Sequence, residues 1–197
     1  MSFILASGSA SRQRLLTAVA VPFTAIPAEV EEAAIRDHML KEGAPLASIA
    51  AALADAKALH ISKRHPDELV LGADQTLIFG NELISKCADM AEARALLARL
   101  RGKSHQLVSA LTLACAGTVI WRHASTPKLT MRSFSDAFLD LYLATEGDSL
   151  LSGVGCYKLE GLGAQLFENV EGDYFSVLGL PLLPLLAELR NQGVIRA

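Results

Sequence analysis

Two short acidic segments carry side chains suited to metal binding or proton transfer. Asp74 follows the apolar run at residues 69–72, and Glu31-Glu32 follow the short apolar run at residues 22–26. Ligand sites in α/β proteins gather at the carboxyl ends of strands, so Asp74 is placed to hold a divalent metal or to activate water. Each segment also has an ordinary interpretation. Asp74 suits a turn, and the acidic run suits a solvated loop or a helix N-terminus.

The N-terminal segment suits an anion. A buried strand at Phe3–Ala6 leads into three hydroxyls, Ser7, Ser9 and Ser11, which are followed by Arg12 in the first turn of a predicted helix. Free backbone N–H groups, the helix dipole and a bidentate arginine together favour phosphate. The alternative is a serine N-cap beside solvated arginines. The segment is not a P-loop, because no Gly-Lys-Ser or Gly-Lys-Thr follows.

Further polar candidates lie on predicted connections. Lys86 follows a hairpin that returns it toward the strand edge of Asp74, whereas Lys57 lies inside a predicted helix and is expected at the surface. The segment 153–163 contains four glycines and carries Lys158 and Glu160 two residues apart. If this segment is extended, both side chains share one face, and its glycines allow a close approach to a ligand.

Composition restricts the function classes. The 197 residues are 51% hydrophobic and 20% charged, with a net charge of −3, which is typical of a folded protein without a general attraction to nucleic acid or anionic membrane. Any anionic ligand therefore needs locally concentrated positive partners. The three cysteines form no CxxC pair, so we expect reduced, mostly buried thiols and neither a zinc site nor a disulfide framework.

The chain shows no pattern that predicts a leader or a membrane span. The N-terminus has no basic segment, and its apolar run is too short for a signal peptide. Residues 104–121 lack Asp, Glu, Lys and Arg, but polar residues interrupt them and Ala116-Gly117 offers a turn. We therefore expect a buried hairpin there, no membrane partner and a cytoplasmic location.

The elements that must position these residues alternate early and become mainly β in the middle of the chain. This order predicts an α/β mixed sheet with an antiparallel portion, in a single domain of two lobes around a cleft. Predicted strands are 3–6, 22–26, 69–72, 76–79, 82–84, two within 104–121, one within 125–134, and 165–170. Predicted helices begin at Ser11 and cover 45–63, 89–102, 135–144 and 181–192.

Six segments in this order resemble the Maf family, across about residues 3 to 193. They are LASGSASRQRLL, Glu31-Glu32, GADQ at 72–75, Lys86, GCYKLEGLGA at 155–164, and EGDYFSVLGLP at 171–181. The resemblance implies an elongated mixed sheet flanked by helices, similar to the inosine triphosphate pyrophosphatases, with a central cleft. It also implies cleavage of a nucleoside triphosphate to the monophosphate and pyrophosphate with Mg²⁺ or Mn²⁺, and a possible homodimer.

The resemblance also implies roles for residues. The catalytic aspartate of the family falls on Asp74 and its metal-side acidic residue on Glu32, so these two are the expected metal ligands. Its phosphate-contacting residues fall on Ser7 or Ser9 and on Arg12, and its lysines fall on Lys57 and Lys86. We expect Asp74, Lys86 and Glu32 to be catalytic, without deciding which carboxylate is ligand and which is base.

Three positions bear on the substrate. Members that act on dTTP and UTP resemble this chain less, because they have Arg where this chain has Ser11, Thr where it has Gln75, and Gln where it has Glu160. Gln75 and the Lys158-x-Glu160 pattern instead resemble the branch that acts on 7-methyl-GTP, although Ser11 departs from both patterns and Cys87 replaces the usual proline. A glutamate can accept hydrogen bonds from the guanine edge, and its charge suits the cationic methylated ring.

Two other classes of function stay open at this point. The first is a nucleotide-binding regulator of cell division or septum formation without significant turnover. The second is a nucleic-acid-binding module, against which the acidic balance and the missing basic stripe count. Release of pyrophosphate from a panel of triphosphates separates the enzyme from both.

Overall fold

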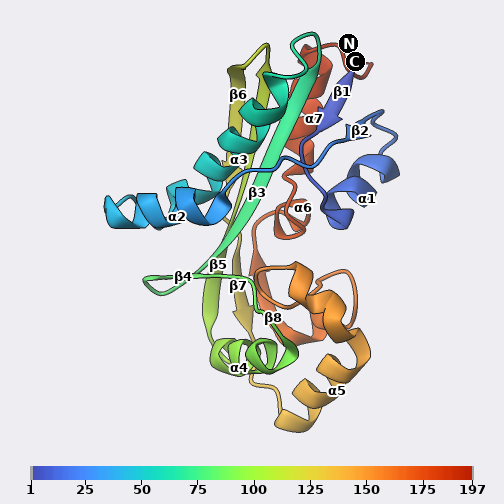
Figure 1. The fold of residues 1–197 in the computed structure, drawn as a ribbon. Coiled ribbons are helices and arrows are strands. Elements are labelled where there is room, and N and C mark those ends of the chain that lie inside the picture. Colours follow the sequence, from blue (N-terminus) through green and yellow to red (C-terminus); the bar gives the residue numbers. More distant parts are fainter. Residues whose placement is uncertain (1, 197) are drawn as a thin grey trace. The chain divides into compact units, whose positions relative to one another are not determined.

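The computed structural model describes residues 2–196 and contains an eight-stranded mixed sheet flanked by helices (Figure 1). The strand order is β2-β1-β3-β5-β7-β8, with β4 paired to β3 and β6 paired to β5. β1 runs parallel to both β2 and β3, whereas the β3–β4, β5–β6, β5–β7 and β7–β8 pairs are antiparallel. The predicted mixed α/β sheet with an antiparallel portion is thus confirmed.

The strands are β1 (Phe3–Leu5), β2 (Thr24–Ala25), β3 (Leu69–Phe79), β4 (Glu82–Ile84), β5 (Ser104–Cys115), β6 (Thr118–Ser125), β7 (Lys128–Met131) and β8 (Phe167–Glu171). The α-helices are α1 (Ala10–Ala18), α2 (Glu32–Lys41), α3 (Leu46–Ser62), α4 (Met90–Leu100), α5 (Asp136–Glu146), α6 (Tyr174–Val177) and α7 (Leu182–Asn191). Two 3₁₀ helices, η1 (Gly147–Ser152) and η2 (Leu162–Leu166), lie between α5 and β8. No helix among residues 2–196 is both long and apolar enough to cross a membrane.

The chain forms two compact units. Unit 1 comprises residues 1–75, 109–125 and 173–197, and unit 2 comprises residues 76–108 and 126–172. Both β3 and β5 contribute to each unit, because the unit boundary falls at Gln75 in β3 and before Ser109 in β5.

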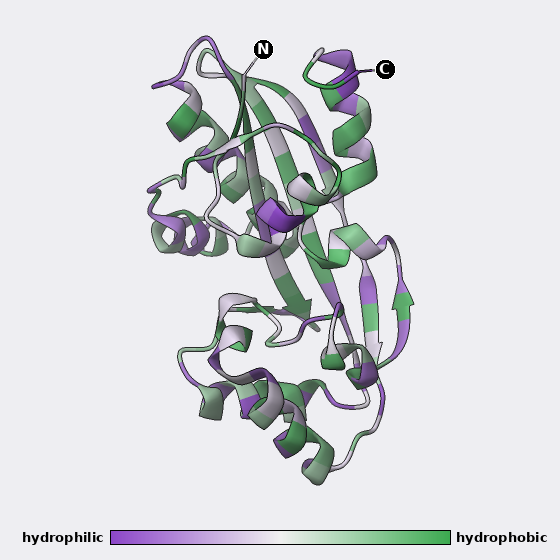
Figure 2. Ribbon diagram, turned by 90° about the vertical axis from the view of Figure 1, so that its right-hand side faces the viewer, coloured by the Kyte–Doolittle hydropathy of each residue, from purple (hydrophilic) through white to green (hydrophobic). Residues whose placement is uncertain are grey.

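The core of unit 1 follows from alternation along its strands, whose hydrophobic residues are green in Figure 2. Successive side chains of a strand point to opposite faces of the sheet. Leu5 and Leu71 join a buried cluster with Leu185 and Leu189 of α7, whereas Ile4 and Val70 pack with Ile61 of α3. Helices α7 and α3 therefore cover opposite faces of the β1–β3 sheet.

Unit 2 is built around well-capped helices. The Asp89 carboxylate accepts a hydrogen bond from the Glu92 N–H at the start of α4, and the Ser135 hydroxyl accepts one from the Phe138 N–H at the start of α5. Both caps agree with the sequence prediction. Helix α4 packs against α5 and η1, and β7 pairs with β8 beside them.

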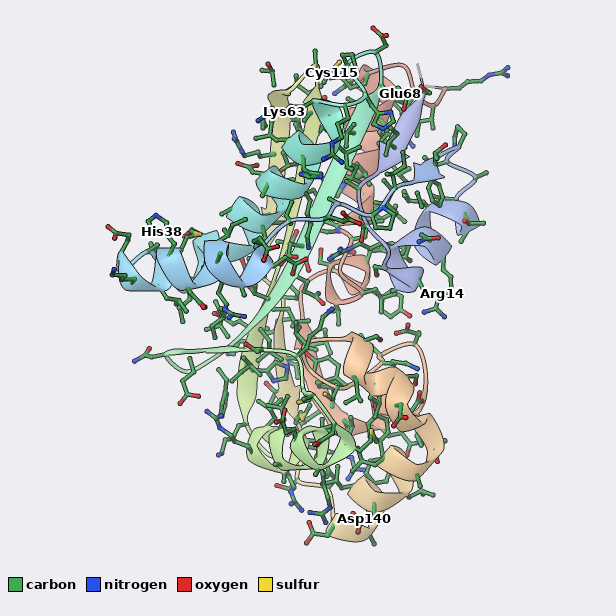
Figure 3. The ribbon with its side chains drawn as sticks, in the orientation of Figure 1. Arg14, His38, Lys63, Glu68, Cys115 and Asp140 are labelled. Carbon is green, nitrogen blue, oxygen red and sulfur yellow. The ribbon has the colours of Figure 1, made fainter. Side chains whose placement is uncertain are left out.

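Several predicted boundaries were wrong. β3 is one strand of eleven residues, so Asp74 and Gln75 lie inside a strand and do not follow one. Helix α1 starts at Ala10 with Ser9 as its N-cap, one residue earlier than predicted. Helix α2 is absent from the predicted helices, although the interpretation of the acidic run as a helix N-terminus is confirmed at Glu32, its first residue. None of the residues of α2 is buried, so it lacks the buried apolar stripe by which a helix is usually recognised. Its charged side chains, with His38 near its end, project from the helix in Figure 3.

The expectation of mostly buried thiols was only partly right, because Cys156 is buried whereas Cys87 and Cys115 are partly exposed.

Candidate active site

Strand β3 determines which way Asp74 faces. A Cβ atom added at Gly72 would lie 2.1 Å from the Ala54 carbonyl oxygen and 2.6 Å from the Ala58 nitrogen, so Gly72 lets the backbone of α3 approach the strand. Residues two apart on a strand point to the same face. Asp74 therefore also faces α3, at the turn of that helix that carries Lys57.

Lys57 joins two carboxylates from different elements. Its Nζ lies 2.6 Å from Asp74 Oδ1 and 2.8 Å from Glu32 Oε1. Asp74 comes from the middle of β3 and Glu32 from the first residue of α2, so one ammonium group holds both predicted metal-side acids. The structure thus brings Glu32, Lys57 and Asp74 together.

The expectation that Lys57 lies at the surface was wrong. Lys57 is 8% exposed, and Asp74 and Arg12 are 7% and 9% exposed. Among the Lys, Arg, Asp and Glu residues at positions 2–196, these three are the ones that are buried. Such groups are rarely buried without partners, and concentrating three of them in one place is typical of a functional site.

Burial dominates the electrostatics of the cluster. It raises the pKa of Asp74, while Lys57 and Arg12 act in the opposite direction through their positive charges. Burial also lowers the pKa of Arg12, against the charges of Asp74 and Glu32. An aspartate whose basicity is raised by burial is a better proton acceptor than an exposed one.

Arg12 anchors the N-terminal loop. Its Nε donates to the Gly179 carbonyl at 2.9 Å, and its NH1 donates to the Ala73 carbonyl at 2.8 Å and to Ser7 Oγ at 3.1 Å. Three of the five N–H groups of an arginine are therefore directed at protein atoms. The guanidinium connects α1 to β3 and to the turn after α6, which places a positive charge one residue from Asp74.

The three N-terminal serines have local roles. Ser7 Oγ accepts from the Ser9 N–H at 3.2 Å, and Ser9 Oγ caps α1 by accepting from the Arg12 N–H at 3.4 Å. Ser11 Oγ donates to the Leu178 carbonyl at 3.3 Å. The serine N-cap of the ordinary interpretation is confirmed for Ser9, whereas its solvated arginine is wrong for Arg12, which is buried. Phosphate contact by these serines stays a prediction.

Gln75 points to the face of β3 opposite Asp74. Its Nε2 lies within hydrogen-bond distance of Ser109 Oγ (2.8 Å) and of the Ser176 and Val177 carbonyls (3.1 and 3.0 Å). Ser109 Oγ in turn donates to the Ser176 carbonyl at 2.7 Å. These acceptors fix the orientation of the amide, with its nitrogen directed toward α6.

The remaining predicted residues belong to unit 2. Lys86 is exposed two residues after β4, and the predicted hairpin that precedes it is confirmed. The segment 153–163 is not extended, because it forms turns that lead into η2, and a Cβ at Gly163 would lie 2.4 Å from the Lys158 carbonyl oxygen. The prediction that Lys158 and Glu160 share one face of an extended segment was therefore wrong. Lys158 Nζ instead contacts Ser149 Oγ at 2.6 Å and Glu146 Oε2 at 3.2 Å.

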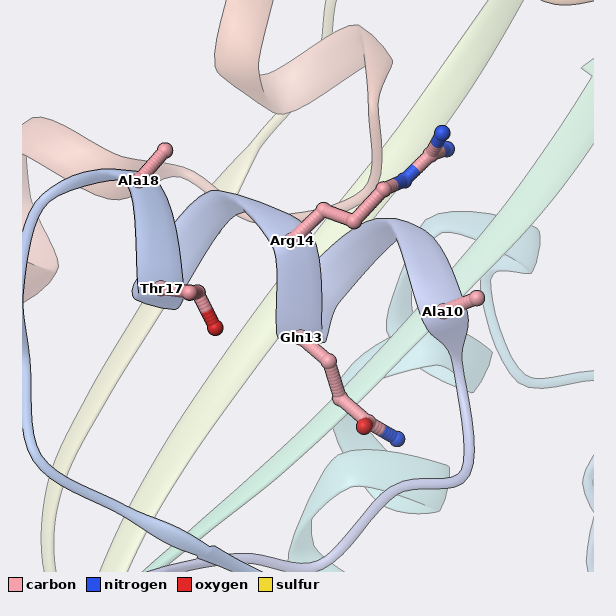
Figure 4. A pocket seen from close by; sticks show the side chains of 5 residues that line it. All are labelled: Ala10, Gln13, Arg14, Thr17 and Ala18. Atoms are coloured by element: carbon pink, nitrogen blue, oxygen red, sulfur yellow. The ribbon is translucent and has the colours of Figure 1, made fainter.

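A hollow of about 460 Å³ lies along α1 and is not part of this cluster. Its lining comes from one side of a single helix, as Figure 4 shows: Ala10, Gln13, Arg14, Thr17 and Ala18. Nothing in this lining supplies a carboxylate, so it does not provide the acid and base chemistry predicted for the site.

Comparison with known proteins places this arrangement in a family. The family model described as Maf-like protein matches residues 2–192. The chain belongs to the Maf family. A nucleoside triphosphate pyrophosphatase of Granulibacter bethesdensis is 48% identical over 99% of each chain. A 7-methyl-GTP pyrophosphatase of Mesorhizobium japonicum is 47% identical over 98% of this chain and 96% of its own. A solved dITP/XTP pyrophosphatase of Mycobacterium abscessus aligns over 98% and 96% of the two chains, with a TM-score of 0.42 and 15% identity.

Sequence reasoning missed two residues that support the site of this Maf chain. Ser109 and Ser176 are fully buried and hold the Gln75 amide. Ser109 is one of the polar residues that interrupt the apolar run 104–121, and Ser176 lies in the family-like segment 171–181, but the sequence assigns neither a role. A hydroxyl within an otherwise apolar strand was the available signal, because buried hydroxyls require a hydrogen-bond partner.

Proposed function

We propose that this Maf protein hydrolyses a nucleoside triphosphate to the monophosphate and pyrophosphate. The observation that carries the proposal is the buried Lys57 ammonium held between Asp74 and Glu32, with the Arg12 guanidinium beside them. The names of the full-length relatives, nucleoside triphosphate pyrophosphatase and 7-methyl-GTP pyrophosphatase, support the same reaction.

In this proposal Asp74 is the general base toward the attacking water. Burial raises its pKa, and the short bond from Lys57 fixes its orientation, so the carboxylate is both basic and positioned. Lys57, Arg12 and Lys86 neutralise the charges of the triphosphate. In the reaction, negative charge develops on the pyrophosphate leaving group. Positive side chains that are already in position stabilise this charge and so lower the activation barrier.

A divalent cation fits the carboxylates. Asp74 and Glu32 each place an oxygen within 2.8 Å of the same nitrogen, so their side chains already converge on one positive charge. Residues 2–196 contain no group of three His, Cys, Asp or Glu side chains that could form a complete protein site. Mg²⁺ is commonly bound through one or two carboxylates together with substrate phosphates and water. Asp74 and Glu32 would hold such an ion, which would neutralise phosphate charge as it arrives with the substrate.

The finer proposal is that 7-methyl-GTP is preferred over dTTP and UTP. Gln75 has its Nε2 directed at Ser109 and α6, so the carbonyl oxygen is the end of the amide that can accept from a donor on the base. Glu160 adds an anionic acceptor that suits the guanine edge and the cationic methylated ring. Lys158 lies two residues before Glu160 in the sequence. A cytoplasmic location, a homodimer and the absence of nucleic-acid binding stay predictions.

The test is a pyrophosphate-release assay on a panel of triphosphates with Mg²⁺ or Mn²⁺. The panel contains 7-methyl-GTP, dTTP, UTP, GTP and ATP. We expect Asp74→Asn to lower the rate by roughly 10² to 10⁴, the range for loss of a general base, while the circular dichroism spectrum is retained. Asp67→Asn, an exposed aspartate just before β3, is the matched control and should leave the rate unchanged.

Each result has a defined meaning. If Asp74→Asn retains most of the activity, Asp74 is not the base. If triphosphates bind without pyrophosphate release, the chain is a nucleotide-binding regulator and the enzyme proposal is wrong. We expect Glu160→Gln to reduce the preference for 7-methyl-GTP, with the exposed Glu168→Gln as control. No preference for 7-methyl-GTP over dTTP and UTP in the unmodified protein would overturn the substrate assignment.

A further inference from the structure

Four consecutive backbone carbonyls in unit 1 hold side chains of the candidate site. They belong to residues 176–179, which form the end of α6 and the turn after it (Figure 1), and we call them the carbonyl segment. The first two, of Ser176 and Val177, accept from Gln75 Nε2 at 3.1 and 3.0 Å. The carbonyl segment therefore fixes which end of the Gln75 amide faces α6.

The other two carbonyls hold the start of α1. The Leu178 carbonyl accepts from Ser11 Oγ at 3.3 Å, and the Gly179 carbonyl accepts from Arg12 Nε at 2.9 Å. Backbone oxygens that follow the end of a helix are no longer used by the helix itself, so they can accept from side chains. One short stretch of backbone thus orients side chains of β3 and of α1 at the same time.

Asp173 fixes this stretch from the other end of α6, as the N-cap of that helix. Its Oδ2 accepts from the Ser176 N–H at 2.7 Å and from the Ser176 hydroxyl at 2.6 Å. Its Oδ1 accepts from the Phe175 N–H at 3.3 Å. A helix of four residues has few hydrogen bonds of its own, so a cap that satisfies three donors determines its conformation.

The contacts of the carbonyl segment are buried. Ser109 and Ser176 are fully buried, and Arg12 is 9% exposed. A Cβ atom added at Gly179 would lie 3.6 Å from Gln75 Oε1 and 3.7 Å from an Arg12 terminal nitrogen, so both side chains pack against this turn. A buried donor that loses its acceptor is not readily compensated by water. A shift of the carbonyl segment would therefore reorient both Gln75 and Arg12.

We propose that Asp173 is a positioning residue of the active site and a determinant of base preference. By capping α6 it sets the carbonyl segment, which orients the Gln75 amide for the base and the Arg12 guanidinium for the triphosphate. Asp173 itself contacts neither part of the substrate. Its effect on turnover rests on the proposed function, whereas its effect on the orientation of Gln75 and Arg12 does not.

The structural part is tested by NMR of the isotope-labelled, full-length protein without substrate. We expect Asp173→Ala to shift the Gln75 side-chain amide signal and to speed exchange of the Arg12 Nε–H with solvent at least about tenfold. Asp173→Asn should restore both, because asparagine caps a helix as well as aspartate does. Unchanged Gln75 and Arg12 signals in Asp173→Ala would overturn the proposal.

The matched control is Asp89→Ala. It removes an aspartate N-cap of the same kind from α4, which carries none of the proposed site residues and belongs to unit 2. It should lower stability to urea as Asp173→Ala does, but should leave the Gln75 and Arg12 signals unchanged. If Asp173→Ala does not fold, Ser176→Ala removes only the hydroxyl bond to Oδ2 and should shift the same signals less.

Kinetics of pyrophosphate release test the consequence for catalysis. We expect Asp173→Ala to raise KM for the preferred triphosphate at least about fivefold while kcat stays within about threefold, because Lys57 and its two carboxylates are held by other elements. The preference among bases should narrow, and Asp173→Asn should restore it. An equal rise of KM in Asp89→Ala would assign the effect to instability and overturn the proposal. An unmodified protein that releases no pyrophosphate would refute the proposed function, and the NMR signals would still decide the role of Asp173.

Discussion

Replacing Lys57 with methionine removes the ammonium and leaves a side chain of similar length. Asp74 then stays buried without its 2.6 Å partner, while Glu32, whose side chain is 53% exposed, can turn to water. The instability should therefore come almost entirely from Asp74. Glu32→Gln is the matched control, because it removes the other carboxylate from the same ammonium while leaving the buried pair intact.

The loss of stability in Lys57→Met depends on pH, because the unpaired Asp74 carboxylate can bind a proton and become neutral. Breaking a buried ion pair by removing one partner typically costs about 3–5 kcal/mol. Protonating a carboxyl of ordinary pKa 3.8 costs about 6 kcal/mol at pH 8 but only about 2 kcal/mol at pH 5. We therefore expect Lys57→Met to lower the unfolding free energy by about 3–5 kcal/mol at pH 8 and by less than about 2 kcal/mol at pH 5.

The sign of this dependence follows from linkage. The variant raises the pKa of Asp74 in the folded state further above its unfolded value, so the folded state binds the extra proton and the variant regains stability as pH falls. Urea unfolding, followed through the fluorescence of the single tryptophan, Trp121, measures the effect between pH 5 and 8. Glu32→Gln should cost less than about 1 kcal/mol throughout. A Lys57→Met deficit that does not change with pH would refute the reasoning.

Two further predictions concern the scaffold. Gly72→Ala should lower the unfolding free energy by at least about 3 kcal/mol or prevent folding, because its Cβ would overlap the α3 backbone. Gly153→Ala is the control, because its Cβ meets no atom within 4 Å. Equal stabilities of the two variants in urea would contradict this account. Burial lowers the pKa of His105 from 6.5 to about 4, so its contribution to stability is present above pH 6.5 and is lost as pH falls to 4. Between pH 6.5 and pH 4 we expect the unmodified protein to lose about 3 kcal/mol of unfolding free energy that His105→Gln does not lose. Parallel pH profiles of stability for the two proteins would contradict this role of His105.

The sequence was most informative where a local pattern and a chemical constraint coincide. Asp89 followed by Glu92 predicted the start of α4, and Ser135 predicted the start of α5, because a cap is satisfied within four residues. The grouping of Asp74, Glu32 and Lys57 came from the family resemblance. Composition alone gave no reason to connect residues 32, 57 and 74, which are brought together by three separate elements.

The errors share a physical cause, which is that tertiary partners override local preference. Asp74 looks like the end of a strand because a charged residue is costly inside one, yet β3 continues since Lys57 neutralises that charge. Lys57 looks like a surface residue for the same reason. Lys158 was assigned to an extended segment, but its contacts with Glu146 and Ser149 belong to a turn that sequence periodicity does not describe.

Unit 1 has consequences for synthesis on the ribosome, because its third segment is made last. While residues 1–172 emerge, the Arg12 Nε–H lacks the Gly179 carbonyl and the Gln75 amide lacks the Ser176 and Val177 carbonyls. Helix α7, which supplies Leu185 and Leu189 to the core, is missing as well. The nascent chain therefore exposes one face of β1 and β3 until residues 173–191 have been translated, so unit 1 cannot complete its core before its third segment is available.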